Sequence, residues 1–287
     1  MTALALILVL VSAVAHASWN LLAKRASGGP VFNWLFDCLS VAVCAPLVLA
    51  QIVIGGPPNL GDAAALFMLG SAVLHLGYFL LLGQAYRVGD LSLVYPLARG
   101  AGPVLATSAA IAVFGEHPSG LALAGAALIA AGVVVFTGDL RRLRGSRGGR
   151  SVVLALLTGL LIAGYTLWDK QAVSTVKVPP LLYFWGLTTM RAGLLTPWAM
   201  THWRTVQHEW GAHRQHALGI AILSPASYIL VLYALVLSPV SYVAPAREIG
   251  ILLGAVMGAR WLAEADSRRR LVGAVAMVFG VLALAVG

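Results

Sequence analysis

Charged residues are scarce in this sequence, and cysteine is almost absent. Only 10% of the 287 residues are charged, whereas a soluble domain carries roughly 25%, and the mean hydropathy is +0.90. The soluble globular, disordered and disulfide-rich secreted classes are therefore excluded. The two cysteines, Cys38 and Cys44, share one apolar segment and face different sides of a helix, because six residues turn a helix by about 600°. The composition indicates an integral membrane protein whose main partner is the lipid bilayer.

Motifs of catalysis, cofactor binding and metal binding are also missing. No HExxH, GxSxG, GxGxxG or GxxxxGK[ST] pattern occurs. Four histidines between residues 202 and 216 lie in a predicted connector, and because their spacing fits no standard zinc site, a solvated loop is the better interpretation. The 19 basic and 10 acidic residues indicate loop charges that set membrane topology. We expect no enzyme activity, no cofactor, no metal and no nucleic-acid partner.

Apolar runs bounded by glycine, proline and charged residues predict ten membrane-spanning helices. A helix needs about 20 apolar residues to cross the hydrocarbon core, and the chain has room for about ten of them. The run at 4–15 excludes a transmembrane barrel, and the first run is interpreted as a retained helix because no basic residue precedes it. The predicted spans are 3–23, 31–54, 63–86, 90–113, 117–138, 152–173, 179–201, 217–237, 240–261 and 269–286.

The two halves of the chain carry the same motif. An S-x-V-x-P pattern in SLVYPLARG, from Ser92, recurs in SYVAPAREIG, from Ser241, and each copy is followed by a glutamate, Glu116 or Glu264, and then by G-x6-G. Because five spans are an odd number, the second copy must enter the membrane in the opposite sense. The predicted fold is an all-α integral membrane protein with ten transmembrane helices in two inverted five-helix repeats. These repeats are residues 1–138 and 151–287, joined by a basic linker at 139–150.

This doubled pattern, together with HASWNLLAKR near the N-terminus and the segment YRVGDLSLVYPLARGAGP, resembles the EamA-like ten-helix branch of the drug/metabolite transporter superfamily. The resemblance covers essentially the whole chain. It implies a multi-pass protein of the cell (inner) membrane that transports a small organic metabolite, with export as the expected direction. It does not specify the substrate.

Basic residues are unevenly distributed between the two sides of the predicted bundle. The even-numbered connectors hold only Lys170 and Lys177. The odd-numbered connectors hold Lys24, Arg25, Arg87, Arg141, Arg142, Arg144, Arg147, Arg150, Arg204, Arg214, Arg260, Arg268, Arg269 and Arg270. By the positive-inside rule both termini lie outside, whereas the resemblance implies cytoplasmic termini. The strength of the bias favours the charge rule for this chain.

Ionisable side chains inside a span cost at least a few kcal/mol, so each is a candidate for function. Arg99 ranks first, as an anion-binding residue with Tyr95 one turn earlier, because Pro96 removes a backbone hydrogen bond and is expected to open the helix there. The alternative is that Arg99 only pairs with a carboxylate of the bundle. The candidates of this kind are Arg99, Arg191, Arg247, Glu248, Asp37 and Asp169.

The second copy of the motif adds candidates for gating and coupling. The repeat aligns Glu248 with Arg99, so opposite charges occupy equivalent positions, with Arg247 beside them and Pro245 as a hinge. Glu248, Arg247 and Asp37 could gate the transporter or only form structural ion pairs. The repeated Glu116 and Glu264 are expected to cap the helices that follow them, and small residues at 122, 126, 130, 276 and 280 favour close packing of spans five and ten.

Polar ridges on three spans are candidates for lining a cavity. They consist of His16, Trp19 and Asn20 in span one, His75 and Tyr78 in span three, and Tyr165 and Asp169 in span six. The alternative for the histidines is hydrogen bonding between helices. Asp169 is a coupling carboxylate if it faces a cavity, but we expect it at the membrane interface, paired with Lys170, because Lys170 and Lys177 indicate that the span ends nearby.

The sequence therefore predicts a secondary transporter that works by alternating access around a midplane cavity. The predicted substrate-binding residues are Arg99, Tyr95, His16, Trp19, Asn20, His75, Tyr78 and Tyr165. The buried arginines favour an anionic or zwitterionic metabolite, with protons as an optional coupling ion. One alternative is an exporter of lipophilic cations that uses Glu248 or Asp37, and a remote one is a membrane-embedded enzyme acting on lipid phosphates. We expect a monomer, with a homodimer as the alternative.

Overall fold

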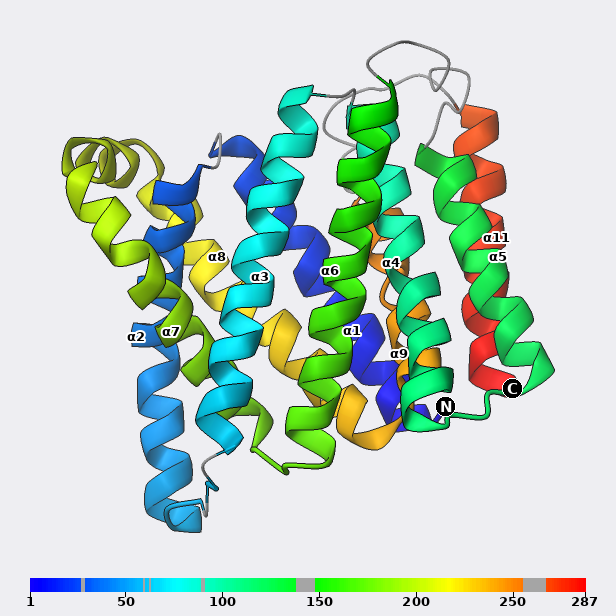
Figure 1. The fold of residues 1–287 in the computed structure, drawn as a ribbon, viewed down its shortest axis with the longest axis horizontal. Helices are drawn as coiled ribbons and strands as arrows, with labels where there is room; N and C mark the ends of the chain where they lie inside the picture. Colours follow the sequence, from blue (N-terminus) through cyan, green and yellow to red (C-terminus); the bar gives the residue numbers. More distant parts are fainter. Residues whose placement is uncertain (27–28, 59, 62, 89–90, 138–147, 255–266) are drawn as a thin grey trace.

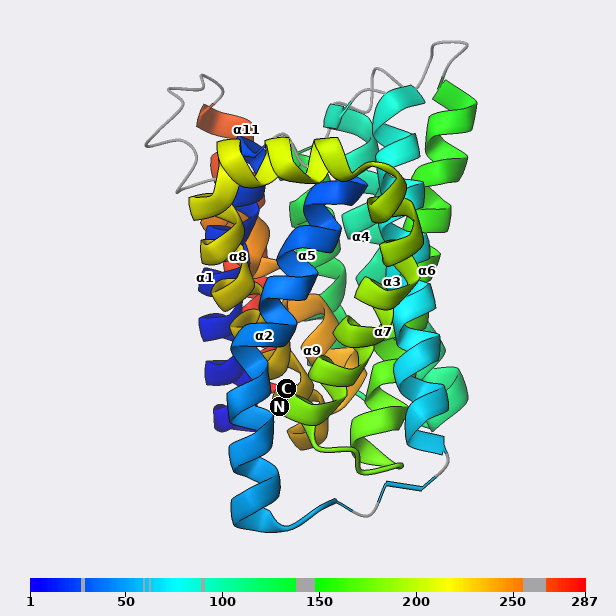
Figure 2. The same ribbon diagram turned by 90° about the vertical axis from the view of Figure 1, so that its left-hand side faces the viewer.

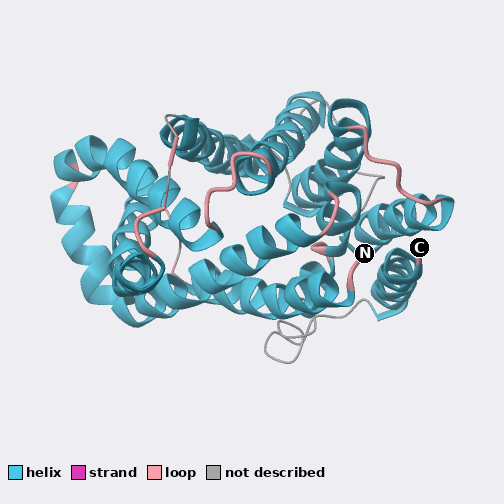
Figure 3. Cartoon of the chain, turned by 90° about the horizontal axis from the view of Figure 1, so that it is seen from below, coloured by secondary structure: helices cyan, strands magenta, loops and turns pink. Residues whose placement is uncertain are grey.

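The computed structural model describes all residues except 27–28, 59, 62, 89–90, 138–147 and 255–266, and the regular structure of the described part is entirely helical (Figure 1). The N- and C-termini lie near each other at the same end of the bundle (Figures 1 and 3). The helices are α1 (Ala3–Arg25), α2 (Pro30–Gly55), α3 (Ala63–Val88), α4 (Leu91–Phe114), α5 (Gly120–Thr137), α6 (Gly148–Ser174), α7 (Pro180–Thr201), α8 (Trp203–Leu237), α9 (Val240–Ala246) and α11 (Ser267–Val286).

Local sequence signals set several of the helix ends. The Thr2 hydroxyl accepts a hydrogen bond from the Ala5 amide, 3.2 Å away, at the start of α1. Pro30 and Pro180 open α2 and α7, where the missing amide hydrogen costs nothing. Gly56 follows α2 with a φ of 78°, a conformation that glycine adopts without strain.

The all-α membrane class predicted from the sequence is confirmed. Six helices, α1, α2, α3, α4, α6 and α8, are long and apolar enough to cross a membrane, and α5 and α11 contain shorter apolar helices. The full count of ten spans stays a prediction. Most of the predicted basic linker lies outside the described residues, and its last residues, from Gly148, belong to α6.

The predicted span at 240–261 is interrupted. Helix α9 ends at Ala246, residues 247–248 form a turn, and residues 249–254 are helical again. The amides of Glu248 and Gly250 donate to the carbonyls three residues earlier, at 3.0 and 3.1 Å, as in a tight 3₁₀-type turn. The break lies after Pro245, whose own missing bond would reach Ser241 at the start of α9, so the proline alone does not account for it.

Helix α4, in contrast, continues through Pro96, so the predicted opening beside Arg99 is not found. Pro96 is close to the start of α4. The bond that it cannot make would reach the carbonyl of Ser92, in the first turn, where one missing bond disturbs little.

The predicted connector at 202–216 is also wrong, because most of it is helical. It forms the first part of α8, which lies across the ends of neighbouring helices before a kink at His213, where φ is −128° and ψ is 16° (Figure 2). Trp203, Val206 and Trp210 recur at helical spacing, and Val206 is buried. The segment is thus an amphipathic surface helix, and its charged residues hid that periodicity.

The predicted close packing of spans five and ten is confirmed in the pair α5 and α11 (Figure 1). A methyl group built on Gly280 would lie 2.7 Å from the carbonyl oxygen of Gly125, and one on Gly125 would lie 2.7 Å from the carbonyl oxygen of Gly280. One on Gly132 would lie 2.9 Å from the carbonyl oxygen of Gly273. The two G-x6-G motifs therefore form one interface where the backbones approach closely.

Candidate functional site

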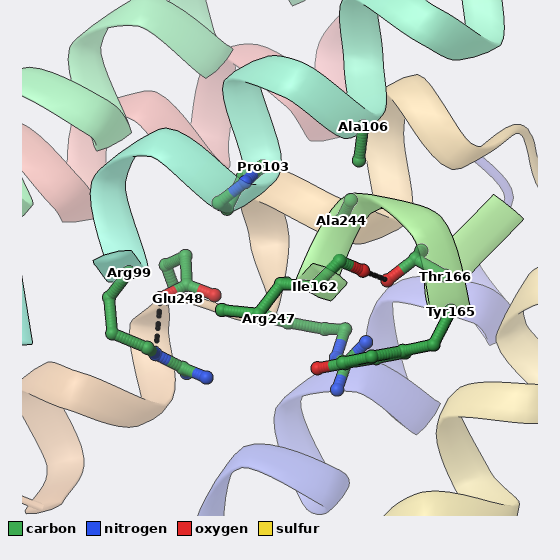
Figure 4. Close-up of a pocket in the computed structure, with 9 residues that line it drawn as sticks. All are labelled: Arg99, Pro103, Ala106, Ile162, Tyr165, Thr166, Ala244, Arg247 and Glu248. Carbon is green, nitrogen blue, oxygen red and sulfur yellow. Dashed lines mark hydrogen bonds and ion pairs between the residues drawn. The ribbon is translucent and has the colours of Figure 1, made fainter. Parts of the chain in front are cut away.

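Two charged residues from different halves of the chain meet at the centre of the bundle. The guanidinium Nε of Arg99, on α4, lies 3.1 Å from a carboxylate oxygen of Glu248, in the turn after α9 (Figure 4). Their side chains are 11% and 5% exposed. The sequence left two roles open for Arg99, binding an anion or pairing with a carboxylate of the bundle, and this structure contains the ion pair.

Two pockets adjoin this ion pair, and Arg99 and Arg247 line both of them. The first has a volume of about 10 Å³, room for about one water molecule, and is lined by Arg99, Pro103, Ala106, Ile162, Tyr165, Thr166, Ala244, Arg247 and Glu248 (Figure 4). The second, also of about 10 Å³, is lined by Val9, Ser12, Ala13, His16, Arg99, Ser227 and Arg247. The arginines are therefore the charged groups that the two pockets share.

Arg247 has no acidic partner in the described part of the chain. Its guanidinium carbon lies 5.9 Å from the centre of the Tyr228 ring, and the side chain extends toward Tyr165 (Figure 4). The turn after α9 separates it from Glu248, which reaches Arg99 instead. Two arginines and one glutamate line the pockets, so this region carries a net positive charge.

Asp169 is fully buried among hydroxyl groups. One carboxylate oxygen accepts hydrogen bonds from Ser71 Oγ at 2.6 Å and from the Tyr183 hydroxyl at 2.7 Å, and the other accepts one from the Tyr228 hydroxyl. The expected pair with Lys170 at the interface is therefore wrong. Consecutive residues on a helix point about 100° apart, so Asp169 faces the bundle while Lys170 faces the end of α8.

An aromatic stack joins the Asp169 cluster to the first pocket. The rings of His75 and Tyr165 are stacked with centroids 4.2 Å apart, and His75 lies edge-on to Tyr228 at 5.3 Å. Tyr78 is edge-on to Tyr165 at 6.0 Å. The structure thus brings together three of the predicted residues, His75, Tyr78 and Tyr165. Sequence reasoning missed Ser71, Tyr183 and Tyr228, because isolated hydroxyl residues in apolar helices carry no spacing signal.

The predicted ridge on α1 reaches the site only in part. His16 lines the second pocket and packs edge-on against Trp19, with ring centroids 5.0 Å apart. Asn20 is exposed and donates to the carbonyl of His16, and neither Trp19 nor Asn20 lines the two pockets. Tyr95 and Pro96 lie in α4, but their side chains are outside the described part of the structure.

A second buried ion pair lies away from the pockets, between α2 and α7. Arg191 donates from Nε and from a terminal nitrogen to the two carboxylate oxygens of Asp37, at 2.7 and 2.5 Å. The two side chains are 8% and 1% exposed, and the Phe79 ring lies 5.5 Å from the guanidinium carbon. Neither residue lines the pockets described above.

Polar contacts at the end of the bundle that carries the termini join the two halves of the chain. The Glu116 carboxylate accepts hydrogen bonds from the amides of Val240 and Ser241, at 2.7 and 2.8 Å. It therefore caps α9 and not the helix that follows it, because the fold brings the start of α9 closer than the start of α5. Within the second half, Lys170 Nζ donates to the carbonyls of Leu235 and Ser238, at 2.5 and 3.2 Å. The predicted counterpart Glu264 lies outside the described residues.

Histidines, cysteines and acids do not gather into any group of three or more that could hold a metal ion within the described residues. The surface histidines of α8 belong to an amphipathic helix.

Comparison with known proteins gives one family and one fold. The sequence model of the EamA-like transporter family matches residues 149–286. A solved structure titled only "Crystal structure of protein" is similar over 96% of this chain and 97% of its own, with a TM-score of 0.70 and 15% identity. That likeness, found among 29 matching chains of solved structures, establishes the fold alone. No curated protein matches the sequence.

Proposed function

Since this chain belongs to the EamA-like transporter family of the drug/metabolite transporter superfamily, we propose that it is a secondary carrier of a small anionic or zwitterionic metabolite. It is a multi-pass membrane protein, and the family is one of transporters, not of enzymes. The carrier works by alternating access, in which the central pockets open to each side of the membrane in turn.

The charge of the central pockets carries this proposal. Arg247 has no acidic partner among the described residues, whereas the charge of Arg99 is matched by Glu248. A cation without a counter-charge is costly at the centre of a membrane protein, so an anionic group of the substrate provides the missing charge. Guanidinium groups bind carboxylate, sulfonate and phosphonate oxygens through two parallel hydrogen bonds.

The remaining pocket residues shape the rest of the site. His16 and Ser12 line the second pocket, and Tyr165, supported by His75 and Tyr78, lines the first. The substrate competes with Glu248 for Arg99, so its binding loosens the contact between α4 and the turn after α9. This exchange is the proposed gating step, with Pro245 as the hinge.

The packing of the helices supports the proposed inverted repeat. The repeat equates α1 with α6, α3 with α8 and α5 with α11, so a contact of α1 with α8 requires an equivalent contact of α6 with α3. Both contacts are present. The repeat also equates Gly125 with Gly273 and Gly132 with Gly280. The close approach of Gly125 to Gly280 therefore requires an equivalent approach of Gly273 to Gly132, and that contact is present.

The distribution of exposed arginines supports an orientation with both termini outside. Arg25, Arg87, Arg150 and Arg204 are exposed at helix ends opposite the two termini (Figure 1). By the positive-inside rule that end is cytoplasmic, in the cell (inner) membrane. Cytoplasmic fluorescence from a GFP fused to the C-terminus would contradict this orientation. Export, the direction that the resemblance implies, then runs toward the side of the termini.

Ligand-dependent thermal stability tests the proposed substrate class. The purified protein is heated with methylphosphonate, benzenesulfonate, glutamate or the lipophilic cation tetraphenylphosphonium. A ligand at about 100 times its Kd stabilises the folded protein by about 2.7 kcal/mol. We expect at least one anion to stabilise the wild type, and Arg247→Gln to lose that effect while Arg247→Lys keeps part of it.

The matched control is Arg214→Gln, which removes an exposed arginine of α8 and should respond to anions as the wild type does. Stabilisation by anions that persists in Arg247→Gln contradicts the assignment of the site. Stabilisation by the cation alone favours the exporter of lipophilic cations, which needs a free carboxylate. Asp37 and Glu248 are both ion-paired in this structure.

A further inference from the structure

Asp169 differs from the other two buried acids of the described bundle. Asp37 pairs with Arg191 and Glu248 pairs with Arg99, whereas Asp169 contacts three hydroxyl groups and no cation. A carboxylate that is fully buried in a membrane protein without a basic partner is expensive, and its charge can be removed by taking up a proton. The burial of Asp169 and its contacts thus indicate that this residue has a function beyond packing.

The hydrogen bonds around Asp169 can satisfy both of its protonation states. When Asp169 is ionised, Ser71, Tyr183 and Tyr228 all donate to it. The Tyr183 hydroxyl also has a second acceptor, the carbonyl oxygen of Phe67, at 3.2 Å. When Asp169 is protonated, its hydrogen can be donated to the Tyr183 oxygen while Tyr183 donates to Phe67, so that no buried polar group loses its partner.

Tyr228 links this carboxyl to the proposed substrate site. Its hydroxyl donates to Asp169, and its ring lies between His75, at 5.3 Å, and the guanidinium of Arg247, at 5.9 Å. The titratable and charged groups facing the cluster are therefore His75 from α3, Tyr183 from α7, Tyr228 from α8, Arg247 after α9, and Tyr165 on α6 itself. Arg247 is the nearest positive charge on this path.

We propose that Asp169 is a proton-binding site through which this carrier moves one proton together with its anionic substrate. The inference rests on the proposed function. With Asp169 ionised, the charges of Arg99, Arg247, Glu248 and Asp169 cancel, and with Asp169 protonated they sum to one positive charge. The protonated form therefore binds an anion better, and by reciprocity a bound anion favours protonation. Because the proton and the anion move in the same direction, export requires an outward gradient of the substrate that is larger than any opposing inward gradient of protons.

Infrared difference spectroscopy of the protein in lipid tests the proton site without a substrate. Several carboxyl groups gain a C=O band as the pH falls, and we expect one component of that band to be missing from Asp169→Asn. Tyr228→Phe removes one donor to the ionised form, so this component should remain but titrate at higher pH by about one unit. The control Glu209→Gln, which changes an acid in the surface part of α8, should retain this component with an unchanged midpoint. A pH-dependent C=O spectrum of Asp169→Asn that is identical to that of the wild type overturns the proposal.

Proton uptake on anion binding tests the coupling. Methylphosphonate, benzenesulfonate and glutamate are added to weakly buffered protein, and we expect the anion that stabilises the wild type to cause uptake of about one proton per molecule. Asp169→Asn, checked for folding by its unfolding temperature, should bind that anion without proton uptake. Anion binding without uptake in the wild type overturns the coupling. If the Asp169 band is present but no anion binds, the proton site is supported and the anion function fails.

Discussion

The buried pair of Asp37 and Arg191 allows a quantitative test with a double-mutant cycle. Both oxygens of Asp37 accept from the guanidinium, at 2.7 and 2.5 Å, and both side chains are almost fully buried. Asp37→Leu removes the negative charge and leaves Arg191 buried without compensation, and Arg191→Met leaves Asp37 buried without its cation. Breaking one side of such a pair costs about 3–5 kcal/mol of unfolding free energy.

Replacing both partners has a different expected result. Asp37→Leu combined with Arg191→Met exchanges the pair for apolar side chains, and such replacements are often neutral or stabilising. We expect the double variant to be within about 1–2 kcal/mol of the wild type, far from the sum of the single effects. Equilibrium unfolding in mixed micelles, followed by tryptophan fluorescence, measures all four proteins. Glu209→Gln, in the surface part of α8, is the control for loss of an acidic side chain.

Two outcomes would refute this reasoning: a single variant within about 1 kcal/mol of the wild type, or a double variant as unstable as the two singles combined. The same variants test the gating role predicted for Asp37. A stable double variant that still transports shows that the pair only holds α2 to α7. A stable double variant that has lost transport supports gating.

Two further predictions concern helix contacts and are checked by the same unfolding measurement. Gly280→Ala places a methyl group 2.7 Å from the carbonyl of Gly125, so it should destabilise the protein by about 1–3 kcal/mol, whereas Gly193→Ala, with no atom within 4 Å, should not. Equal stability of the two glycine variants would contradict the close backbone contact. Glu116→Gln weakens the cap on the amides of Val240 and Ser241 and should cost about 1–2 kcal/mol, while the exposed neighbour His117→Gln should be neutral. An unchanged Glu116→Gln would show that this cap contributes nothing to stability.

The failed local predictions have a common physical cause. The break after α9 and the continuity of α4 both involve a proline within the same S-x-V-x-P motif, so the motif alone does not decide whether a helix opens. The helical start of α8 was hidden because its apolar residues cover one narrow face of a charged segment. In both cases the outcome depends on neighbouring helices, which local sequence patterns do not specify.

The site was predicted in part. The charged residues of the spans could be identified from the cost of burying them, and His16, His75, Tyr78 and Tyr165 do lie at or beside the pockets. The hydroxyl groups around Asp169 could not be found, because serine and tyrosine are common in membrane helices and their importance here comes from meeting at one carboxylate.

The sequence by itself determined the membrane class, the helical content and the approximate helix positions, because hydropathy and length are properties of contiguous segments. Only the tertiary structure decided that Arg99 meets Glu248, that Arg191 meets Asp37, and that Glu116 caps a helix of the other half. Which charges pair depends on which helix faces come together. That depends on side-chain packing between segments far apart in the chain, and packing leaves no periodic signal in the sequence.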